Sequence, residues 1–250
     1  MKVPIYVINL KSSIDRAKSI DQQFKKLGID YHLFSAINGQ EENILFKKYN
    51  AKKHLLRKGR TLSKGELGCF ASHYLLWKTC LEQNKAIIIL EDDAHLTEHF
   101  PSFYSSAEKI TNAYEFAWLH SSSRGGKYFQ LDKIDSFSID KYFKEYICAT
   151  GYLITPSAAK KFLTYMEEWI YPVDDSMTRF YENGVENLAI SPACIIANSD
   201  LDSTIGEDNR GKRDKKLTLI IKAKREYFNL ISNFSRFLHN LKFIYRLKNK

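Results

Sequence analysis

Residues 85–96 read KAIIILEDDAHL, and this stretch decides the fold and the candidate site of the chain. Residues 86–90 are wholly apolar and rich in isoleucine, which is typical of a strand buried on both faces, as in a parallel sheet between helices. Glu91, Asp92 and Asp93 follow directly. Adjacent acids repel one another, and ligands of open α/β sheets bind beyond the carboxyl ends of strands. The pattern therefore predicts Mg²⁺ or Mn²⁺ shared with a phosphate group; the alternative is a solvated acidic loop.

The chain opens with the pattern of a βαβ unit. Residues 3–9 predict a first strand, and the helix that follows has Ser12 or Ser13 as its N-cap and ends at Gly28. Residues 31–36 predict a second strand. A nucleotide would bind at the end of the first strand, although the sequence there has no GxGxxG fingerprint of dinucleotide-binding folds.

A cationic segment and a helix lead from this unit to the acidic stretch. Residues 40–64 predict a mobile loop with some helix, either a solvated face or a flap that closes over a pyrophosphate or an anionic acceptor. The helix predicted at residues 63–81 begins with Ser63, and Glu66 completes the pattern of a capping box. His73 on this helix is more typical of a packed core histidine than of a catalytic one.

The second half alternates further strands and helices, so we expect one α/β domain. Helices are predicted at residues 101–110, 156–169 and 174–180, strands at residues 115–120, 146–155 and 190–197, and polar loops at residues 121–127 and 198–210. Pro172 ends one helix, and Asp174 is well placed to cap the next.

Charge is concentrated at the end of the chain. The net charge is +9, but residues 210–250 carry 13 Lys and Arg against two acids, which leaves residues 1–209 slightly acidic. This distribution argues against a nucleic-acid-binding body. Four cysteines without CxxC spacing predict reduced thiols. Neither the order of a signal peptide nor an apolar run of about 20 residues is seen, so we expect a cytoplasmic protein.

The basic tail has an apolar stripe at helical spacing. The stripe consists of Tyr227, Leu230, Ile231, Phe234, Leu238, Leu241 and Tyr245. A basic amphipathic helix predicts either binding to an anionic membrane surface or docking through the stripe onto the body or a partner.

Several segments together resemble glycosyltransferase family 25, the lipooligosaccharide galactosyltransferase family of Gram-negative bacteria. They are IYVINLKSSIDR at 5–16, SAINGQ at 35–40, LSKGELGCFASHYLLW at 62–77, AIIILEDDA at 86–94, GYLITPSAAKKFL at 151–163 and PVDDSM at 172–177. The resemblance spans about residues 3–205 and omits the tail. Its most specific part is the pair GELGCFASH and LEDDA.

The resemblance implies a GT-A fold over residues 1–209, a Rossmann-like nucleotide-binding α/β domain whose mixed sheet is flanked by helices. Residues 210–250 would be an added basic helical tail. The implied activity is an inverting transfer from a UDP-sugar, usually UDP-galactose, to a hydroxyl of a lipooligosaccharide or lipopolysaccharide. The triplet at 91–93 stands where the family has an Asp-x-Asp-type motif, with Glu first.

The resemblance also implies roles for individual residues. Asp93, with Glu91, would hold Mn²⁺ or Mg²⁺ against the two phosphates, and Glu91 or Asp92 would contact ribose or a metal-bound water. Further nucleotide contacts or their supports are expected from three places in the chain: Asn9, Leu10 and Arg16 around uridine, Ala36 and Gly39 beside the base, and Lys64, Glu66, Ser72 and His73 on the motif helix.

Inversion by direct displacement needs one carboxylate as general base near the acceptor hydroxyl. Asp174 and Asp175 are the candidates, and Asp174 is preferred because the Asp after Pro-Val matches the motif better. A plain helix N-cap is the alternative for Asp174. Residues 198–210 could add a metal or diphosphate contact.

Four other functions are weighed against this one. They are a collagen-type hydroxylysine galactosyltransferase, a non-catalytic sugar-nucleotide-binding protein, a metal-dependent phosphohydrolase, and a nucleic-acid binder acting through the tail alone. The missing secretory signal argues against the first, and the acids at 91–93 and 174 argue against the second. The expected location is the cytoplasmic face of the bacterial inner membrane, where a lipid-linked acceptor and anionic lipid would meet the tail.

Overall fold

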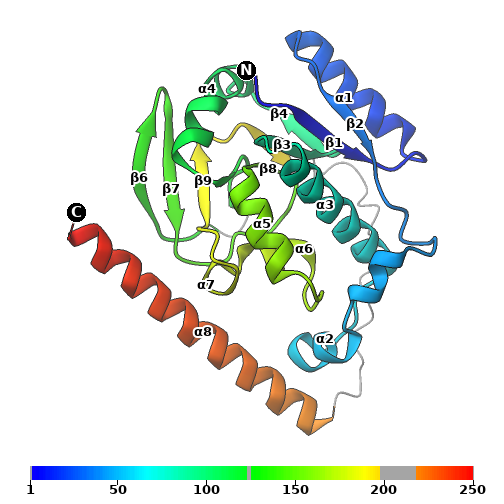
Figure 1. Cartoon of the computed structure of the whole chain (residues 1–250), viewed down its shortest axis with the longest axis vertical. Coiled ribbons are helices and arrows are strands. Elements are labelled where there is room, and N and C mark those ends of the chain that lie inside the picture. Colours follow the sequence, from blue (N-terminus) through cyan, green and yellow to red (C-terminus); the bar gives the residue numbers. More distant parts are fainter. Residues whose placement is uncertain (1, 123–124, 198–217, 250) are drawn as a thin grey trace.

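The computed structural model describes residues 2–122, 125–197 and 218–249. The expected loop at 198–210 and the expected domain boundary at 209/210 lie outside the described residues. Figure 1 shows a large twisted sheet with helices packed against it and one long helix, α8, along its outside.

The sheet has eight strands in the order β2-β1-β3-β8-β5-β9-β7-β6. Its strands are β1 (Ile5–Asn9), β2 (His32–Ser35), β3 (Ile87–Glu91), β5 (Phe116–Trp118), β6 (Tyr128–Ile134), β7 (Phe137–Tyr142), β8 (Gly151–Ile154) and β9 (Leu188–Ser191). A second, small sheet pairs β4 (Ala94–Leu96) with β10 (Ile195–Ala197). β1 lies between β2 and β3, parallel to both, whereas β8 is antiparallel to β3. The sheet is therefore mixed, and the wholly parallel surroundings expected for residues 86–90 are wrong on one side.

Helices cover both faces of the sheet. They are α1 (Ile14–Leu27), α2 (Ala51–Lys58), α3 (Lys64–Glu82), α4 (Phe100–Ala113), α5 (Pro156–Tyr165), α6 (Val173–Thr178), α7 (Phe180–Asn183) and α8 (Leu219–Lys248), with a short 3₁₀ helix, η1 (Ile44–Lys48). Ile87 and Ile89 of β3 pack in the core cluster that includes α3 and α5, and Ile88 and Leu90 pack in the cluster that includes α1 and α4. Both faces of β3 are thus buried, as its unbroken apolar pattern predicts.

Capping residues confirm the predicted start of α3 and the predicted end of α1. Ser63 caps α3, and its side chain and that of Glu66 form the predicted capping box. Gly28 ends α1 in the left-handed conformation that glycine tolerates. Two other predicted elements are too long: the strand at 146–155 forms only as β8, and the helix at 156–169 ends at Tyr165.

Three segments differ more from expectation. The strand predicted at 190–197 is divided into β9 and β10 around Pro192, which has no N–H to donate to a ladder. Residues 128–142, for which no strand was predicted, form the hairpin of β6 and β7. β6 is mostly exposed, and its apolar residues do not form the unbroken run of a buried strand. The segment 40–64 is largely helical, with η1 and α2.

α8 docks through its polar face. Arg236 pairs with Glu145, His239 Nε2 lies 2.8 Å from Glu186 Oε1, and Asn240 donates to the Phe143 carbonyl at 3.0 Å. The apolar stripe predicted from the sequence points away from the body, and Phe234 and Tyr245 keep 62% and 71% of their surface exposed. Packing of the stripe onto the body is therefore excluded. No helix in the described ranges is long and apolar enough to span a bilayer.

Candidate active site

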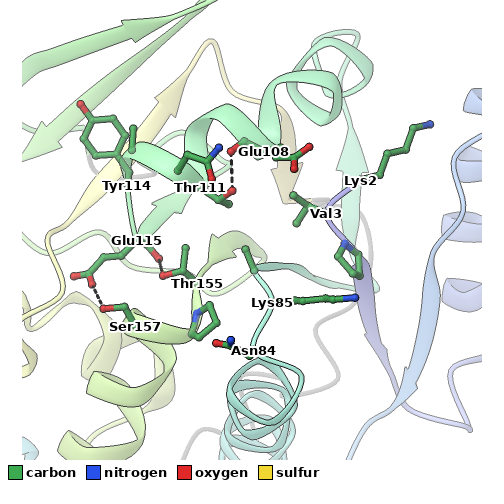
Figure 2. Close-up of a pocket in the computed structure, with 15 residues that line it drawn as sticks. Lys2, Val3, Asn84, Lys85, Glu108, Thr111, Tyr114, Glu115, Thr155 and Ser157 are labelled. Carbon is green, nitrogen blue, oxygen red and sulfur yellow. Dashed lines mark hydrogen bonds between the residues drawn. The ribbon is translucent and has the colours of Figure 1, made fainter.

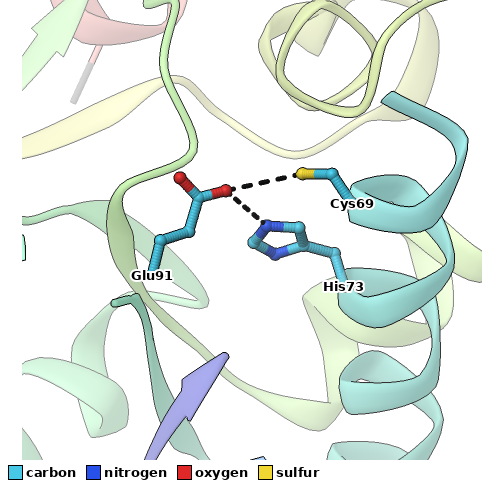
Figure 3. Close-up of side chains that lie close together, drawn as sticks. All are labelled: Cys69, His73 and Glu91. Carbon is cyan, nitrogen blue, oxygen red and sulfur yellow. Dashed lines mark hydrogen bonds and ion pairs between the residues drawn. The ribbon is translucent and has the colours of Figure 1, made fainter. Parts of the chain in front are cut away.

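The three acids after β3 have three different environments. Glu91 ends β3 and its side chain is one quarter exposed. The His73 Nε2 atom lies 3.1 Å from Glu91 Oε1, and the Cys69 thiol donates to the same oxygen at 3.5 Å (Figure 3). Burial pushes the pKa of Glu91 up, but the hydrogen bonds that it accepts from His73 and Cys69 favour the charged form and the pKa is lowered. Glu91 is thus held as a carboxylate in a fixed orientation.

A second layer fixes His73. Its Nδ1 atom lies 2.8 Å from the Tyr152 hydroxyl, which also accepts the indole N–H of Trp77 at 2.9 Å. The hydroxyl therefore has its own proton to give to Nδ1, and this leaves an N–H on Nε2 to donate to Glu91. His73 is fully buried in this chain of contacts.

Both carboxylate oxygens of Asp92 accept hydrogen bonds from side chains of the protein. It accepts the side-chain N–H of Asn9 at 2.7 Å on one oxygen and Arg16 Nη1 at 3.0 Å on the other. Burial raises the pKa of Asp92 in spite of these two donors. These contacts tie the end of β1 and the first turn of α1 to the loop after β3.

Asp93 differs from Glu91 and Asp92 because one of its carboxylate oxygens is buried without a partner in the described part of the chain. Its Oδ1 atom is buried and has no hydrogen-bond partner among the described residues. Burial, followed by the charge of Glu91, raises the pKa of Asp93 to about 7. A buried carboxylate oxygen without a donor is costly unless a cation or proton compensates it. Asp93 therefore fits a hard divalent cation, and Glu91, which lines the same cavity, can offer a second carboxylate oxygen.

A second donor set overlaps this one. Cys69, His73 and Glu91 each offer one ligand atom within 4.8 Å of the others. Sulfur, imidazole and carboxylate suit zinc, but only with a thiolate. Burial raises the pKa of the Cys69 thiol well above its usual value, so the trio is better suited to orienting Glu91 than to binding zinc.

A cavity of about 250 Å³ adjoins the acids and gathers most of the predicted nucleotide contacts. The residues from the prediction that line it are Leu10, Arg16, Ala36, Gly39, Ser72, Glu91, Asp92 and Asp93. Ile8, Ile37, Asn38, Gln40, Gly65 and Cys69 complete the wall. Its volume is close to the lower end of small-molecule sites, roughly 300 Å³.

Four predicted contact residues lie outside this wall. Asn9 and His73 act behind the acids. Glu66 receives two bonds from Arg60, at 2.6 and 2.8 Å, in addition to capping α3. Lys64 is exposed, and its contribution to the site is the backbone carbonyl, which lies against Gly39. The structure thus gives Glu66 and Lys64 supporting positions.

The segment with Ile37 and Gly39 packs closely against the first turns of α3 through its backbone. A Cβ at Gly39 would lie 1.8 Å from the Lys64 carbonyl oxygen, and one at Gly68 would lie 2.5 Å from the Ile37 carbonyl oxygen. Ser72 Oγ accepts the Ile37 N–H at 2.9 Å. The glycines of SAINGQ and GELG therefore serve the same contact, because only glycine lets these two segments touch.

The two late acids are clearly distinguished by their partners. Asp175 pairs with Lys58 at 2.5 Å and lies 3.6 Å from Arg179. Asp174 has no ion pair within 4.0 Å in the described ranges, and its Oδ1 accepts the N–H of Asp175 at 2.8 Å. Pro172, not Asp174, occupies the N-cap of α6, so the predicted capping role of Asp174 is wrong.

The charge of Glu91 acts on Asp174. Burial, followed by the charge of Asp175, raises the pKa of Asp174 to about 6, and Glu91 adds to the shift. Asp174 in turn contributes to the raised pKa of Cys69, which lines the cavity. A carboxyl group with a pKa of about 6 is mostly ionised at pH 7, and without a cation of its own it can accept a proton from a hydroxyl.

Sequence reasoning missed several supporting residues. Cys69 had a usable signal, because it stands four residues before His73 and so shares its helix face. Tyr152, Lys58 and Arg179 had none, since tertiary packing alone brings them to the acids.

A larger hollow, about 620 Å³, lies elsewhere (Figure 2). It adjoins the starts of β1 and β3, between Lys2 and Lys85 on one side and Glu115 and Ser157 on the other. The Ser157 hydroxyl donates to Glu115 at 2.8 Å. This hollow is at the opposite end of β3 from the acids, so it does not belong to the candidate site.

Comparison with known proteins finds one matching family model and several relatives. The model of "Glycosyltransferase family 25 (LPS biosynthesis protein)" matches residues 2–177. Lipooligosaccharide biosynthesis protein lex-1 of Haemophilus influenzae is 27% identical over 64% of this chain and 63% of its own. Lipooligosaccharide biosynthesis protein lic2B of the same species is 30% identical over 62% of this chain and 60% of its own. Procollagen galactosyltransferase 1-A of Xenopus laevis is 34% identical over 38% of this chain and 17% of its own. The chain thus matches less than two thirds of the length of these relatives.

Proposed function

Because the chain belongs to glycosyltransferase family 25, we propose that it is a metal-dependent enzyme that transfers galactose from UDP-galactose, with inversion, to a saccharide hydroxyl of lipooligosaccharide or lipopolysaccharide. The proposal includes the GT-A assignment of the nucleotide-binding domain and the donor cavity beside residues 91–93. The observation that carries it is Asp93 at the wall of that cavity, whose Oδ1 atom is buried and has no hydrogen-bond partner among the described residues.

The residues of the chain divide the work of this reaction. Leu10, Ala36 and Gly39 enclose the nucleoside in the donor cavity, and Arg16 and Asn9 hold Asp92 in place. A divalent cation on Asp93 and Glu91 supplies charge neutralisation of the diphosphate leaving group. Asp174 accepts the proton of the acceptor hydroxyl as this oxygen attacks the anomeric carbon from the face opposite the diphosphate.

A transfer assay tests the proposal. The purified chain is incubated with UDP-galactose or another UDP-sugar, Mn²⁺ or Mg²⁺, and oligosaccharide released from lipooligosaccharide by mild acid. We expect a mass increase of one hexose that depends on the metal ion and is fastest with UDP-galactose. Equal turnover of donor without acceptor would identify a phosphohydrolase. UDP binding without any turnover would identify a non-catalytic binder.

A collagen-type activity is the second candidate, because Procollagen galactosyltransferase 1-A is among the relatives. The Haemophilus lipooligosaccharide proteins match a larger share of the chain and therefore favour a bacterial saccharide acceptor. A hydroxylysine-containing collagen peptide in the same assay separates the two: we expect no transfer to it.

We also propose that α8 attaches the enzyme to the cytoplasmic face of the inner membrane. The outward face of the helix carries Leu230, Phe234, Leu238 and Leu241, all at least 40% exposed, and Lys and Arg flank this face. Apolar side chains gain from burial at the lipid surface, and each basic residue adds about 1 kcal/mol near anionic lipid.

The prediction concerns vesicle binding. Changing Phe234 and Leu238 together to Ser is expected to weaken the partition of the chain onto anionic vesicles by at least about 100-fold, because burial of each side chain is worth roughly 1.5–3 kcal/mol and about 1.4 kcal/mol is a factor of ten. Binding of the wild-type chain should weaken at high salt. Ser235→Ala, on the half-buried face, is the control and should float like wild type. Equal flotation of the double variant and wild type would refute a membrane role for this face.

A further inference from the structure

A second cavity, of about 350 Å³, lies where α8 crosses the body. α2 and α7 both contact α8, and Figure 1 shows α8 running past them. The cavity is bounded by α8 on one side and by α2 and α6 on the other, and Asp175 is part of its wall. It is thus separate from the donor cavity, whose wall carries Glu91 and Asp93.

Asp174, the candidate base, is next in the chain to Asp175, which lines the cavity under α8. A general base must touch the hydroxyl that attacks the donor sugar. A ligand in the cavity under α8 would therefore lie close to the segment that carries the base.

The lining of this cavity combines aromatic rings with one cation that has no carboxylate partner among the described residues. The guanidinium carbon of Arg57 is 4.9 Å from the ring centroid of Phe228 on α8 and 5.4 Å from that of Tyr171. Arg57 also donates to the Tyr171 hydroxyl at 2.8 Å. Aromatic faces with a few placed polar groups are typical of sites for small organic ligands.

The other charges in the wall are paired. Lys58 and Arg179 meet Asp175, Arg236 meets Glu145, and Arg225 lies 3.0 Å from Glu226. Arg57, by contrast, has no carboxylate within 4.0 Å among the residues that the structure places. Its planar donor fork matches a carboxylate or phosphate group.

We propose that the cavity between α8 and the body is the acceptor subsite, which binds a saccharide ring at Phe228 and an acidic substituent of that saccharide at Arg57. This inference rests on the proposed function and deepens it, because it assigns the acceptor an anionic group and gives α8 a second role. The same helix then presents its outer face to lipid and its inner face to the saccharide that the lipid carries.

The test compares inward and outward positions of α8 with acid-released lipooligosaccharide oligosaccharide as the probe. Phe228→Ala and Arg57→Gln are expected to raise the KM for this probe at least tenfold, with the affinity for UDP unchanged. The matched control is Phe237→Ala, at a position of α8 that is 56% exposed and outside the cavity wall, which should leave this KM within twofold of wild type. Asn229→Trp fills the cavity from an exposed position of α8 and should act like Phe228→Ala even if the latter loosens the helix.

Removing phosphate from the probe identifies the acidic group: the Arg57→Gln defect disappears for a phosphate and persists for a carboxylate. A KM within twofold of wild type for both Arg57→Gln and Asn229→Trp would overturn the acceptor subsite. Failure of the proposed function looks different, since wild type itself would then transfer no hexose. Calorimetry with UDP present still decides the subsite in that case: wild type must bind the oligosaccharide and Asn229→Trp must not.

Discussion

Asp174→Asn is expected to lower kcat for hexose transfer by about 10²- to 10⁴-fold, the range for loss of a general base. The amide keeps the shape of the side chain but cannot accept the hydroxyl proton. The affinity for UDP should not change, because Asp174 is absent from the donor-cavity wall. Steady-state rates at saturating donor and acceptor, with calorimetry for UDP, measure both quantities.

Asp175→Asn is the matched comparison, since the two acids are adjacent and equally conservative to replace. It removes the partner of Lys58 and Arg179, so we expect a lower melting temperature and a smaller loss of kcat than for Asp174→Asn. A near-normal rate for Asp174→Asn would place the base elsewhere in the chain.

The pH profile follows from the same group. Burial disfavours the charged form and raises the pKa of Asp174 to about 6, and only the charged form can act as base. The rate of wild type should therefore rise with pH up to about 6 and level off above it. Asp174→Asn should lose this limb of the profile.

Asp93→Asn is expected to abolish the response to Mn²⁺. Transfer at saturating Mn²⁺ should fall by about 10²- to 10³-fold, because charge neutralisation at the leaving group is worth several kcal/mol. Mn²⁺ should raise the melting temperature of wild type but not of this variant. Differential scanning fluorimetry with and without the ion measures the shift.

Without metal, the same change should stabilise the protein. The folded-state pKa of Asp93, about 7, lies above its ordinary value of 3.8, so the folded state holds this proton more tightly. Stability is then lost as pH rises from about 4 to 7, and Asn avoids that loss. Asp15→Asn, at a fully exposed acid, is the control and should change neither measurement. A metal response retained by Asp93→Asn would remove Asp93 from the proposed ligands.

The sequence predicted much of the local structure around the site. The unbroken apolar run before Glu91 identified a strand buried on both faces, and Ser63 with Glu66 fixed the start of α3. These features depend on contacts within a few residues or on which residue types can be buried, so a single sequence carries them. The hairpin of β6 and β7 was not predicted because its first strand is mostly exposed and lacks an unbroken apolar run.

The sequence could not predict which role each acid has. Glu91, Asp92 and Asp93 are alike as residue types, yet only Asp93 keeps a buried oxygen without a partner. Asn9 and Arg16 donate hydrogen bonds to Asp92 although they lie 83 and 76 residues from it in the sequence. Such partners cannot be inferred from local patterns. In the same way, Asp174 and Asp175 are distinguished only by the cations that pair with Asp175. These are Lys58 at the end of α2 and Arg179 directly after α6.

The sequence by itself determined the elements of the α/β unit, the position of the acids at the end of a buried strand, and the presence of a basic amphipathic tail. The tertiary structure decided which acid is free, which acid is paired, and which face of the tail helix meets the body. The physical reason is range: burial patterns and caps are local properties of the chain, whereas the state of a carboxylate depends on charges and donors that only folding brings near it.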